Sequence, residues 1–198
     1  MVKRIDPKRC CGVIVDVQEF FLSQLERRAR SRIEKNTANL VRLLDYFRIP
    51  VVVTLERPID RKGALPGNIG KHLGDLATTF EKDTFDLCGE TKIKNHLARL
   101  KKRQCIVAGC ETDVCVLQSC LGLMQLGYEV YVVEELLFSS ARHVDAAIAR
   151  MRAEGAVFLS YKTLYYELIE AVDGGHHGEL RERTYGPLPD DLPDVAVM

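Results

Sequence analysis

Apolar runs and amphipathic segments alternate along this chain. Runs that predict buried strands, most of them rich in Val and Ile, fall at residues 12–17, 50–55, 104–108, 129–133 and 156–159, and a short strand is predicted around 78–81. Apolar residues at helical spacing predict one helix with its buried face from Ile33 to Leu44, and others over about 91–102, 112–126, 140–153 and 164–172. This alternation predicts an α/β protein with a mostly parallel sheet, helices on both faces and right-handed crossovers.

Two segments lack this pattern. Residues 57–70 contain Gly and Pro and are predicted to form a loop. Beyond residue 172 the chain is rich in Gly, Pro and acidic residues. We therefore expect one folded domain over residues 1–172 and a C-terminal arm over 173–198, lying on the surface or exchanged between subunits.

Composition limits the partners and the location of the protein. The 198 residues carry 28 basic and 28 acidic side chains, so the formal net charge is zero and no general attraction to nucleic acid or to an anionic membrane is expected. No apolar run is long enough to span a bilayer. The chain opens without an apolar leader and has seven cysteines, an odd number, so a reducing cytoplasm is the expected setting.

The segment Val107–Val116 carries the strongest candidate chemistry. It reads as a strand, a turn at Gly109 and a helix that opens at Thr112, which places Cys115 in the first helical turn. Backbone N–H groups and the helix dipole favour an anion there, so we expect a lowered pKa for the Cys115 thiol and a nucleophilic thiolate. The alternative is a small buried side chain at a helix start.

Two charged residues are expected to lie near this cysteine. Asp16 closes the first strand inside the apolar run Val13–Val17, and Lys82 follows the third strand. Ligands of parallel sheets bind beyond the carboxyl ends of the strands, so carboxylate, ammonium and thiol should meet at one rim. Burying an unpaired carboxylate is costly, which favours a specific partner for Asp16 over a role as a surface cap. For Lys82, a solvated loop position is the alternative.

Three motifs, in this order, resemble those of the isochorismatase-like cysteine hydrolases: Val13–Gln18, Glu81–Phe85 and Ala108–Val116. The resemblance covers about residues 11–168. It implies a three-layer fold around a six-stranded sheet, a homo-oligomer and a cofactor-free catalytic triad of Asp16, Lys82 and Cys115. In such a triad the carboxylate takes the thiol proton and the thiolate attacks an amide-like carbonyl. The implied reaction is hydrolysis of a small amide, ureido or related molecule through a thioester-type intermediate.

The resemblance also implies how the oxyanion is held. It places a cis peptide bond between Cys110 and Glu111. This bond would aim the backbone N–H groups of Glu111 and Cys115 at the developing negative charge, forming an oxyanion hole.

The substrate pocket and the absence of a metal follow from the same resemblance. Phe21 corresponds to a pocket aromatic, with core packing as its alternative role, and Gln18 lies beside it. Glu56 takes a position where metal-free members commonly carry Gln, so an acidic group there would change the polarity of the pocket. Nicotinamidases bind a metal through Asp-x-His and a further His, but here Asp60 has no such partner and His72 follows alone. We therefore expect no metal.

Two other functions stay open at this point. The chain could be a non-catalytic interaction protein that keeps the scaffold, or a thiol redox sensor that pairs Cys115 with Cys110 or Cys120. Isochorismatase itself cleaves a vinyl ether without using the cysteine, so the fold alone does not determine the reaction.

Overall fold

A computed structural model describes residues 4–196. Its six strands form one parallel sheet in the order β3-β2-β1-β4-β5-β6, which confirms the predicted fold class. The strands are β1 (Cys10–Val15), β2 (Val51–Glu56), β3 (Ala77–Lys82), β4 (Gln104–Gly109), β5 (Glu129–Leu137) and β6 (Val157–Leu159).

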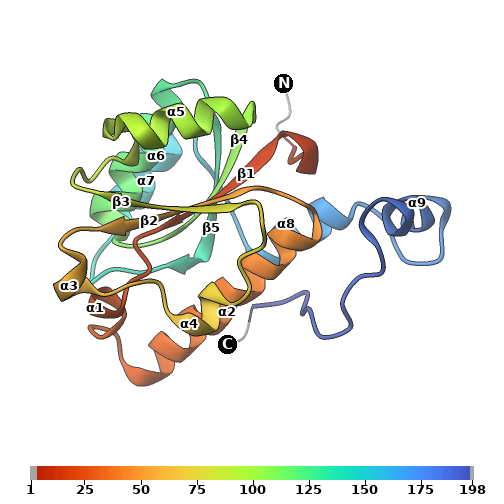
Figure 1. Ribbon diagram of the computed structural model, residues 1–198, viewed down its shortest axis with the longest axis horizontal. Coiled ribbons are helices and arrows are strands. Elements are labelled where there is room, and N and C mark those ends of the chain that lie inside the picture. The colour runs from red at the N-terminus through yellow and green to blue at the C-terminus, as the bar shows by residue number, and fades with distance from the viewer. Residues whose placement is uncertain (1–3, 197–198) are drawn as a thin grey trace.

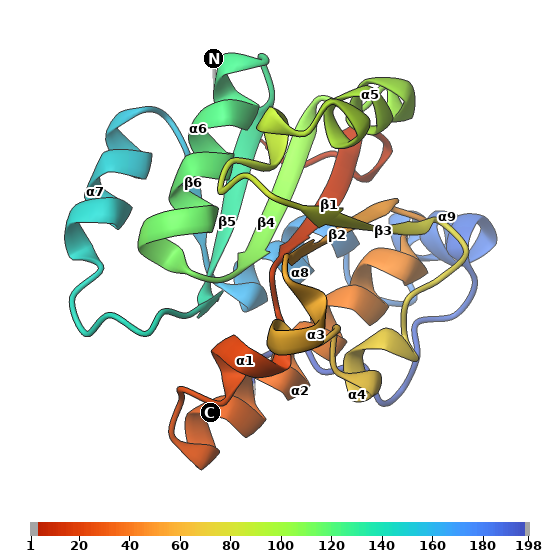
Figure 2. The same ribbon diagram turned by 60° about the vertical axis from the view of Figure 1, so that its left-hand side comes forward.

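Helices cover both faces of the sheet (Figures 1 and 2). The longer helices are α2 (Arg27–Tyr46), α5 (Thr91–Leu100), α6 (Leu117–Gln125), α7 (Asp145–Ala153) and α8 (Tyr161–Ile169). Helices α2 and α8 share one apolar core with alternate residues of β1, such as Cys10 and Ile14. Helices α5, α6 and α7 share the other core with Cys11, Val13 and Val15. Successive strand residues point to opposite faces, so a central strand must be apolar throughout.

Several elements differ from the predicted ones. The segment 57–70, predicted as a loop, contains the short helices α3 (Ile59–Lys62) and α4 (Gly67–Gly70), and a further short helix α1 (Glu19–Leu22) follows β1. The predicted helix over 140–153 begins only at Asp145, and the predicted strand over 129–133 runs on to Leu137. No helix within residues 4–196 is long and apolar enough to cross a membrane.

The C-terminal arm is folded against the domain. It contains α9 (His176–Tyr185), in which Arg181 is buried, donates a hydrogen bond to the carbonyl of Ala171 (3.2 Å) and pairs with Asp173. Further along, Leu192 is buried and the Tyr161 hydroxyl donates to the carbonyl of Pro193 (3.1 Å). The arm therefore packs on α8 within the same chain. The ends of the two predicted segments, residues 1–3 and 197–198, lie outside the described residues.

Candidate active site

Four neighbouring strands bring the candidate site together at their carboxyl ends. Lys82 ends β3 in register with Glu56 at the end of β2. Asp16 follows β1, and Gly109 ends β4 opposite Val15. The order β3-β2-β1-β4 thus places an ammonium, two carboxylates and the turn leading to Cys115 along one rim.

Asp16 is held in position by its backbone. Its φ of 49° lies in the left-handed region, which Asp tolerates better than most residues, and its N–H donates to the carbonyl of Thr54 (3.1 Å). At Gly109, where φ is 127°, a Cβ would lie 2.0 Å from the carbonyl oxygen of Val15. Only glycine allows β4 to pass this closely to the residue before Asp16.

Lys82 and Asp16 form a fully buried ion pair. The two side chains have no exposed surface, and Nζ lies 2.7 Å from Oδ2. The hydroxyl of Thr54 donates to Oδ1 at 2.8 Å, and Nζ also donates to the carbonyl of Thr84 at 3.0 Å. Thr54 and Thr84 were not predicted from the sequence, because a strand threonine and a loop carbonyl carry no signal of this role.

Burial and pairing act against each other on these two groups. Burial raises the pKa of the Asp16 carboxyl, and the nearby Lys82 and Thr54 only partly oppose it. Burial would lower the pKa of Lys82, but the neighbouring Asp16 and Cys115 outweigh it, so the pKa is raised and the ammonium stays charged.

Cys115 contacts both members of this pair and also a second carboxylate, Glu56. Its Sγ is 3.5 Å from Lys82 Nζ and 3.0 Å from Oε2 of Glu56, to which the thiol donates. Only 2% of the residue is exposed. The structure therefore places the three predicted triad residues side by side and adds Glu56 as the direct partner of the thiol.

The predicted lowering of the Cys115 pKa is wrong. Burial is the largest influence and raises the pKa well above its ordinary value; Asp16 and Glu56 raise it further, and only Lys82 opposes them. The local helix also differs from the prediction, because Thr112–Val116 form a π-helical turn and α6 begins only at Leu117. Cys115 is therefore a neutral thiol beside two carboxylates in the resting protein.

Glu56 is held by a second lysine. Lys62, at the end of α3, pairs with Oε1 of Glu56, while Oε2 faces Cys115 and lies 3.8 Å from Lys82 Nζ. Burial acts to raise the pKa of Glu56, but the hydrogen bonds from Cys115 and Lys62 outweigh it, so the pKa is lowered. Lys62 was not predicted, because its approach depends on the turn formed by α3. The only signal was a basic residue six positions after Glu56.

The other two residues predicted for substrate contact support this arrangement. The Gln18 amide donates to the carbonyls of Glu56 (3.2 Å) and Gly63 (2.7 Å) and accepts from the Glu56 N–H (2.7 Å), so it fixes the end of β2 to the loop after α3. The ring of Phe21 is buried in the core and lies 5.6 Å from Lys62 Nζ.

The turn before Cys115 contains a cis peptide bond between Cys110 and Glu111. The Glu111 carbonyl accepts from the N–H of Val116 at 3.0 Å, and its side chain accepts from the N–H of Ser140 at 3.1 Å. These contacts attach the cis peptide to the π-helical turn that follows it and to the segment after β5. Use of the Glu111 and Cys115 N–H groups as an oxyanion hole stays a prediction.

Three residues have ligand atoms close enough to share a metal ion. Ligand atoms of Asp16, Glu56 and Cys115 lie within 4.8 Å of one another, and no other such group of His, Cys, Asp or Glu occurs in residues 4–196. Lys82 Nζ lies 2.7 Å from Asp16, 3.8 Å from Glu56 and 3.5 Å from Cys115, and Lys62 pairs with Glu56, so two ammonium groups already balance the two carboxylates of the cluster. His72, which sequence reasoning weighed as a metal ligand, is not part of this group.

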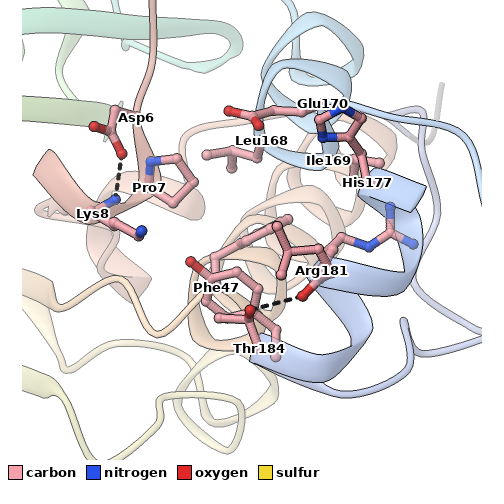
Figure 3. A pocket seen from close by; sticks show the side chains of 12 residues that line it. Asp6, Pro7, Lys8, Phe47, Leu168, Ile169, Glu170, His177, Arg181 and Thr184 are labelled. Atoms are coloured by element: carbon pink, nitrogen blue, oxygen red, sulfur yellow. Dashed lines mark hydrogen bonds between the residues drawn. The ribbon is translucent and has the colours of Figure 1, made fainter. Parts of the chain in front are cut away.

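A separate cavity of about 340 Å³ lies at the amino ends of the strands, at the other end of the sheet from the candidate site. It is lined by the segment before β1, the residue after α2, the end of α8 and one side of α9, including Lys8, Phe47, Glu170 and Thr184 (Figure 3). Because it adjoins the amino end of β1, it contains no candidate site residue.

The remaining cysteines give no support to a redox pair at Cys115. The Cys110 thiol donates to the carbonyl of Asp16 at 3.0 Å, and Cys120 is buried in α6. The close sulfur pair is instead Cys11 and Cys105, 3.6 Å apart on neighbouring strands.

Comparison with known proteins agrees with this architecture. The secreted isochorismatase effector Isc1 of Phytophthora sojae is 30% identical over 178 residues, covering 87% of this chain and 82% of that protein. Among solved structures, MAR1 ribonuclease from Caenorhabditis elegans has a TM-score of 0.79 at 25% identity and covers 96% of this chain and 98% of that one. The Escherichia coli YcaC gene product, described as an octameric hydrolase of unknown specificity, has a TM-score of 0.81 at 21% identity, with 93% and 92% covered.

The isochorismatase domain family matches residues 10–163, which include all six strands and every residue of the candidate site. This match confirms the resemblance found in the sequence motifs. The chain belongs to the isochorismatase family.

Proposed function

We propose that the protein is a cofactor-free cysteine hydrolase of a small amide, ureido or related molecule. One observation carries the proposal: the Cys115 thiol contacts both the Lys82 ammonium and a carboxylate, while Asp16 is paired with that same ammonium. A thiol with an adjacent proton acceptor and a fixed cation has what nucleophilic catalysis requires.

The proposed reaction has two steps. The thiol gives its proton to a carboxylate of the site while Sγ attacks the carbonyl carbon; the C–N bond then breaks, and the nitrogen leaves with a proton. Water hydrolyses the resulting thioester and restores the thiol. Lys82, 3.5 Å from Sγ, stabilises the negative sulfur, and the N–H groups of Glu111 and Cys115 are proposed to hold the oxyanion.

A non-catalytic scaffold is the other candidate. The energetic cost of burying charged groups argues against a scaffold, because two lysines and two carboxylates are buried or partly buried around one thiol. Buried charges of this kind are a weak source of stability, which favours a functional reason for them.

Turnover assays test the proposal. Primary amides, ureido compounds and an RNA are incubated with the protein and with Cys115→Ala, and ammonia or other product release is measured. RNA is included because one structural relative is described as a ribonuclease, and the zero net charge predicts no turnover of it. Turnover of an amide or ureido compound that Cys115→Ala abolishes supports the proposal, as does a covalent acyl adduct on Cys115. Equal turnover by both proteins contradicts it.

Two further proposals concern assembly and location. A homo-oligomer is proposed because the E. coli relative is described as octameric. The cytoplasm is proposed because all seven cysteines are free and buried in the structure, which suits a reducing compartment.

A further inference from the structure

Glu56 lies beside the sulfur of Cys115 on the solvent side of the cluster. Its Oε2 is 3.0 Å from Sγ, and its side chain is 12% exposed. Lys62, its partner, is 20% exposed, whereas the side chains of Asp16 and Lys82 have no exposed surface. A substrate that approaches the thiol from solvent therefore meets Glu56 and Lys62 before it meets the buried ion pair.

Glu56 is fixed in place as an acceptor of hydrogen bonds. Lys62 pairs with Oε1, which leaves Oε2 directed at Cys115. Gln18 holds the backbone of the same residue, because its side-chain oxygen accepts from the Glu56 N–H at 2.7 Å and its amide donates to the Glu56 carbonyl at 3.2 Å. An ionised carboxylate has no hydrogen to donate, so Oε2 can bind only a donor.

Formation of the thiolate removes the donor that Oε2 has in the resting protein. Asp16, which also accepts a hydrogen bond from the thiol, suits the role of proton acceptor because burial raises its pKa. At Glu56 burial is outweighed by the hydrogen bonds from Cys115 and Lys62, which lower the pKa. Once the proton has moved to Asp16, Oε2 lies 3.0 Å from a negative sulfur, and Lys82 Nζ, at 3.8 Å, is beyond hydrogen-bond distance. A donor from the substrate can replace the lost thiol proton.

We propose that Glu56 determines specificity: its Oε2 selects substrates with a hydrogen-bearing nitrogen on the acyl side of the scissile carbonyl and rejects those with a carboxylate there. Ureido compounds and amides with an amino group next to the carbonyl belong to this class. The proposal rests on the proposed cysteine hydrolase function and names the substrate class of that site.

The distances allow this contact during attack. Sγ has to come within about 3–3.5 Å of the carbonyl carbon. Because Oε2 is only 3.0 Å from Sγ, an atom bonded to that carbon can reach hydrogen-bond distance of Oε2. A carboxylate at the same place would bring two negative groups together in a mostly buried site, which is costly.

The acyl side is favoured because its nitrogen stays bound through both steps. The leaving nitrogen departs when the C–N bond breaks, so its N–H groups serve Oε2 only until then. A nitrogen on the acyl side remains in the thioester and continues to donate to Oε2 until water releases the product. Glu56 is then paired in every state of the proposed reaction.

Alkylation of Cys115 by two probes tests the proposal without a known substrate. Iodoacetamide carries N–H donors next to its reactive carbon, and iodoacetate carries a carboxylate there. The two rate constants at Cys115 are measured by peptide mass spectrometry at one fixed pH, and their ratio is divided by the same ratio for glutathione. We expect the normalised ratio of iodoacetamide to iodoacetate to be about tenfold or more in the wild type and close to one in Glu56→Gln.

The ratio separates selectivity from the reactivity of the thiol. Burial, Asp16 and Glu56 together raise the pKa of Cys115, so Glu56→Gln should react faster with both probes while its ratio falls. A merely structural role for Glu56 would change both rate constants together and leave the ratio in place. Asp60→Asn, which removes an exposed carboxylate of α3, is the matched control and should keep the wild-type ratio.

Lys62→Met gives a second, opposite readout. Without this ammonium the charge of Glu56 is less balanced, so iodoacetate should be rejected more strongly and the normalised ratio should rise above that of the wild type. This variant keeps the carboxylate itself, so it tests the proposal even if Glu56→Gln does not fold.

The outcomes distinguish the proposal from the function on which it rests. A wild-type ratio near that of glutathione overturns the proposal, and so does an unchanged ratio in Glu56→Gln. A preference of the wild type for iodoacetate also overturns it and makes Lys62 the group that meets the substrate. Absence of turnover in the substrate assays contradicts the proposed function alone, because alkylation does not require turnover.

Discussion

Replacing Lys82 with methionine is expected to destabilise the fold strongly. Methionine has nearly the same length but no charge, so the Asp16 carboxylate, which has no exposed surface, loses its only cation and keeps neutral partners such as the Thr54 hydroxyl. Removing one partner of a buried ion pair costs about 3–5 kcal/mol. At about 2–4 °C per kcal/mol for a chain of this size, the melting temperature should fall by roughly 6–20 °C.

The double variant Asp16→Asn/Lys82→Met is the control for this prediction. The double variant leaves no unpaired buried charge. Its free energy of unfolding should therefore fall by less than the sum of the decreases in the two single variants. Urea unfolding followed by circular dichroism gives the free energy of unfolding of all four proteins. Additive losses, or a loss below about 1 kcal/mol for Lys82→Met, would refute the buried pair.

The pH dependence of Lys82→Met has a defined sign. Burial raises the pKa of Asp16 in the native protein, and without the ammonium it rises further. A carboxyl group whose pKa is higher in the folded than in the unfolded protein favours the folded state while it is protonated. Its ionisation at higher pH lowers the free energy of unfolding. The difference in the free energy of unfolding between the wild type and Lys82→Met should therefore become smaller as the pH falls through the raised pKa of Asp16. In the wild type, the raised pKa of Lys82 means that its contribution is complete below the ordinary lysine value of 10.5 and is lost at higher pH.

Three more results are expected. Gly109→Ala should lower the free energy of unfolding by at least about 3 kcal/mol, because its Cβ would meet the Val15 backbone; Gly127→Ala, where φ is also positive but the space is open, should lower it by about 1 kcal/mol, and equal losses would contradict the close approach. Light scattering at micromolar concentration should give a mass well above one chain, and a monomer would remove the proposed oligomer. Dialysis against a strong chelator should leave turnover unchanged, because Lys82 and Lys62 already balance the two carboxylates of the one potential ligand cluster among the described residues; a loss that zinc or manganese restores would contradict this.

The sheet was predictable because its central strands are buried on both faces. A run such as Val13–Val15 must be apolar at every position, and the charge that follows it stands out for the same reason. Asp16, Lys82 and Cys115 could be selected because each follows a strand end, and strand ends of a parallel sheet meet at one rim.

The charge state of the site could not be predicted in the same way. The expected thiolate at Cys115 rested on the local helix start, but the pKa of a thiol also depends on burial and on carboxylates that arrive from other strands. Lys62 reaches Glu56 only because Ile59–Lys62 form a helical turn inside a segment that reads as a loop. Such contacts between distant or irregular segments leave no periodic signal.

The packed C-terminal arm affects where this protein can be cut. The family match ends at residue 163, within α8, and a boundary placed there would divide a helix whose Leu164 and Leu168 belong to the core. A cut after residue 172 would also remove Leu192 and the partner of the Tyr161 hydroxyl. Expression fragments designed from the family limits alone would therefore lack part of the hydrophobic core and should be poorly soluble, whereas a fragment carried through the arm keeps that core covered.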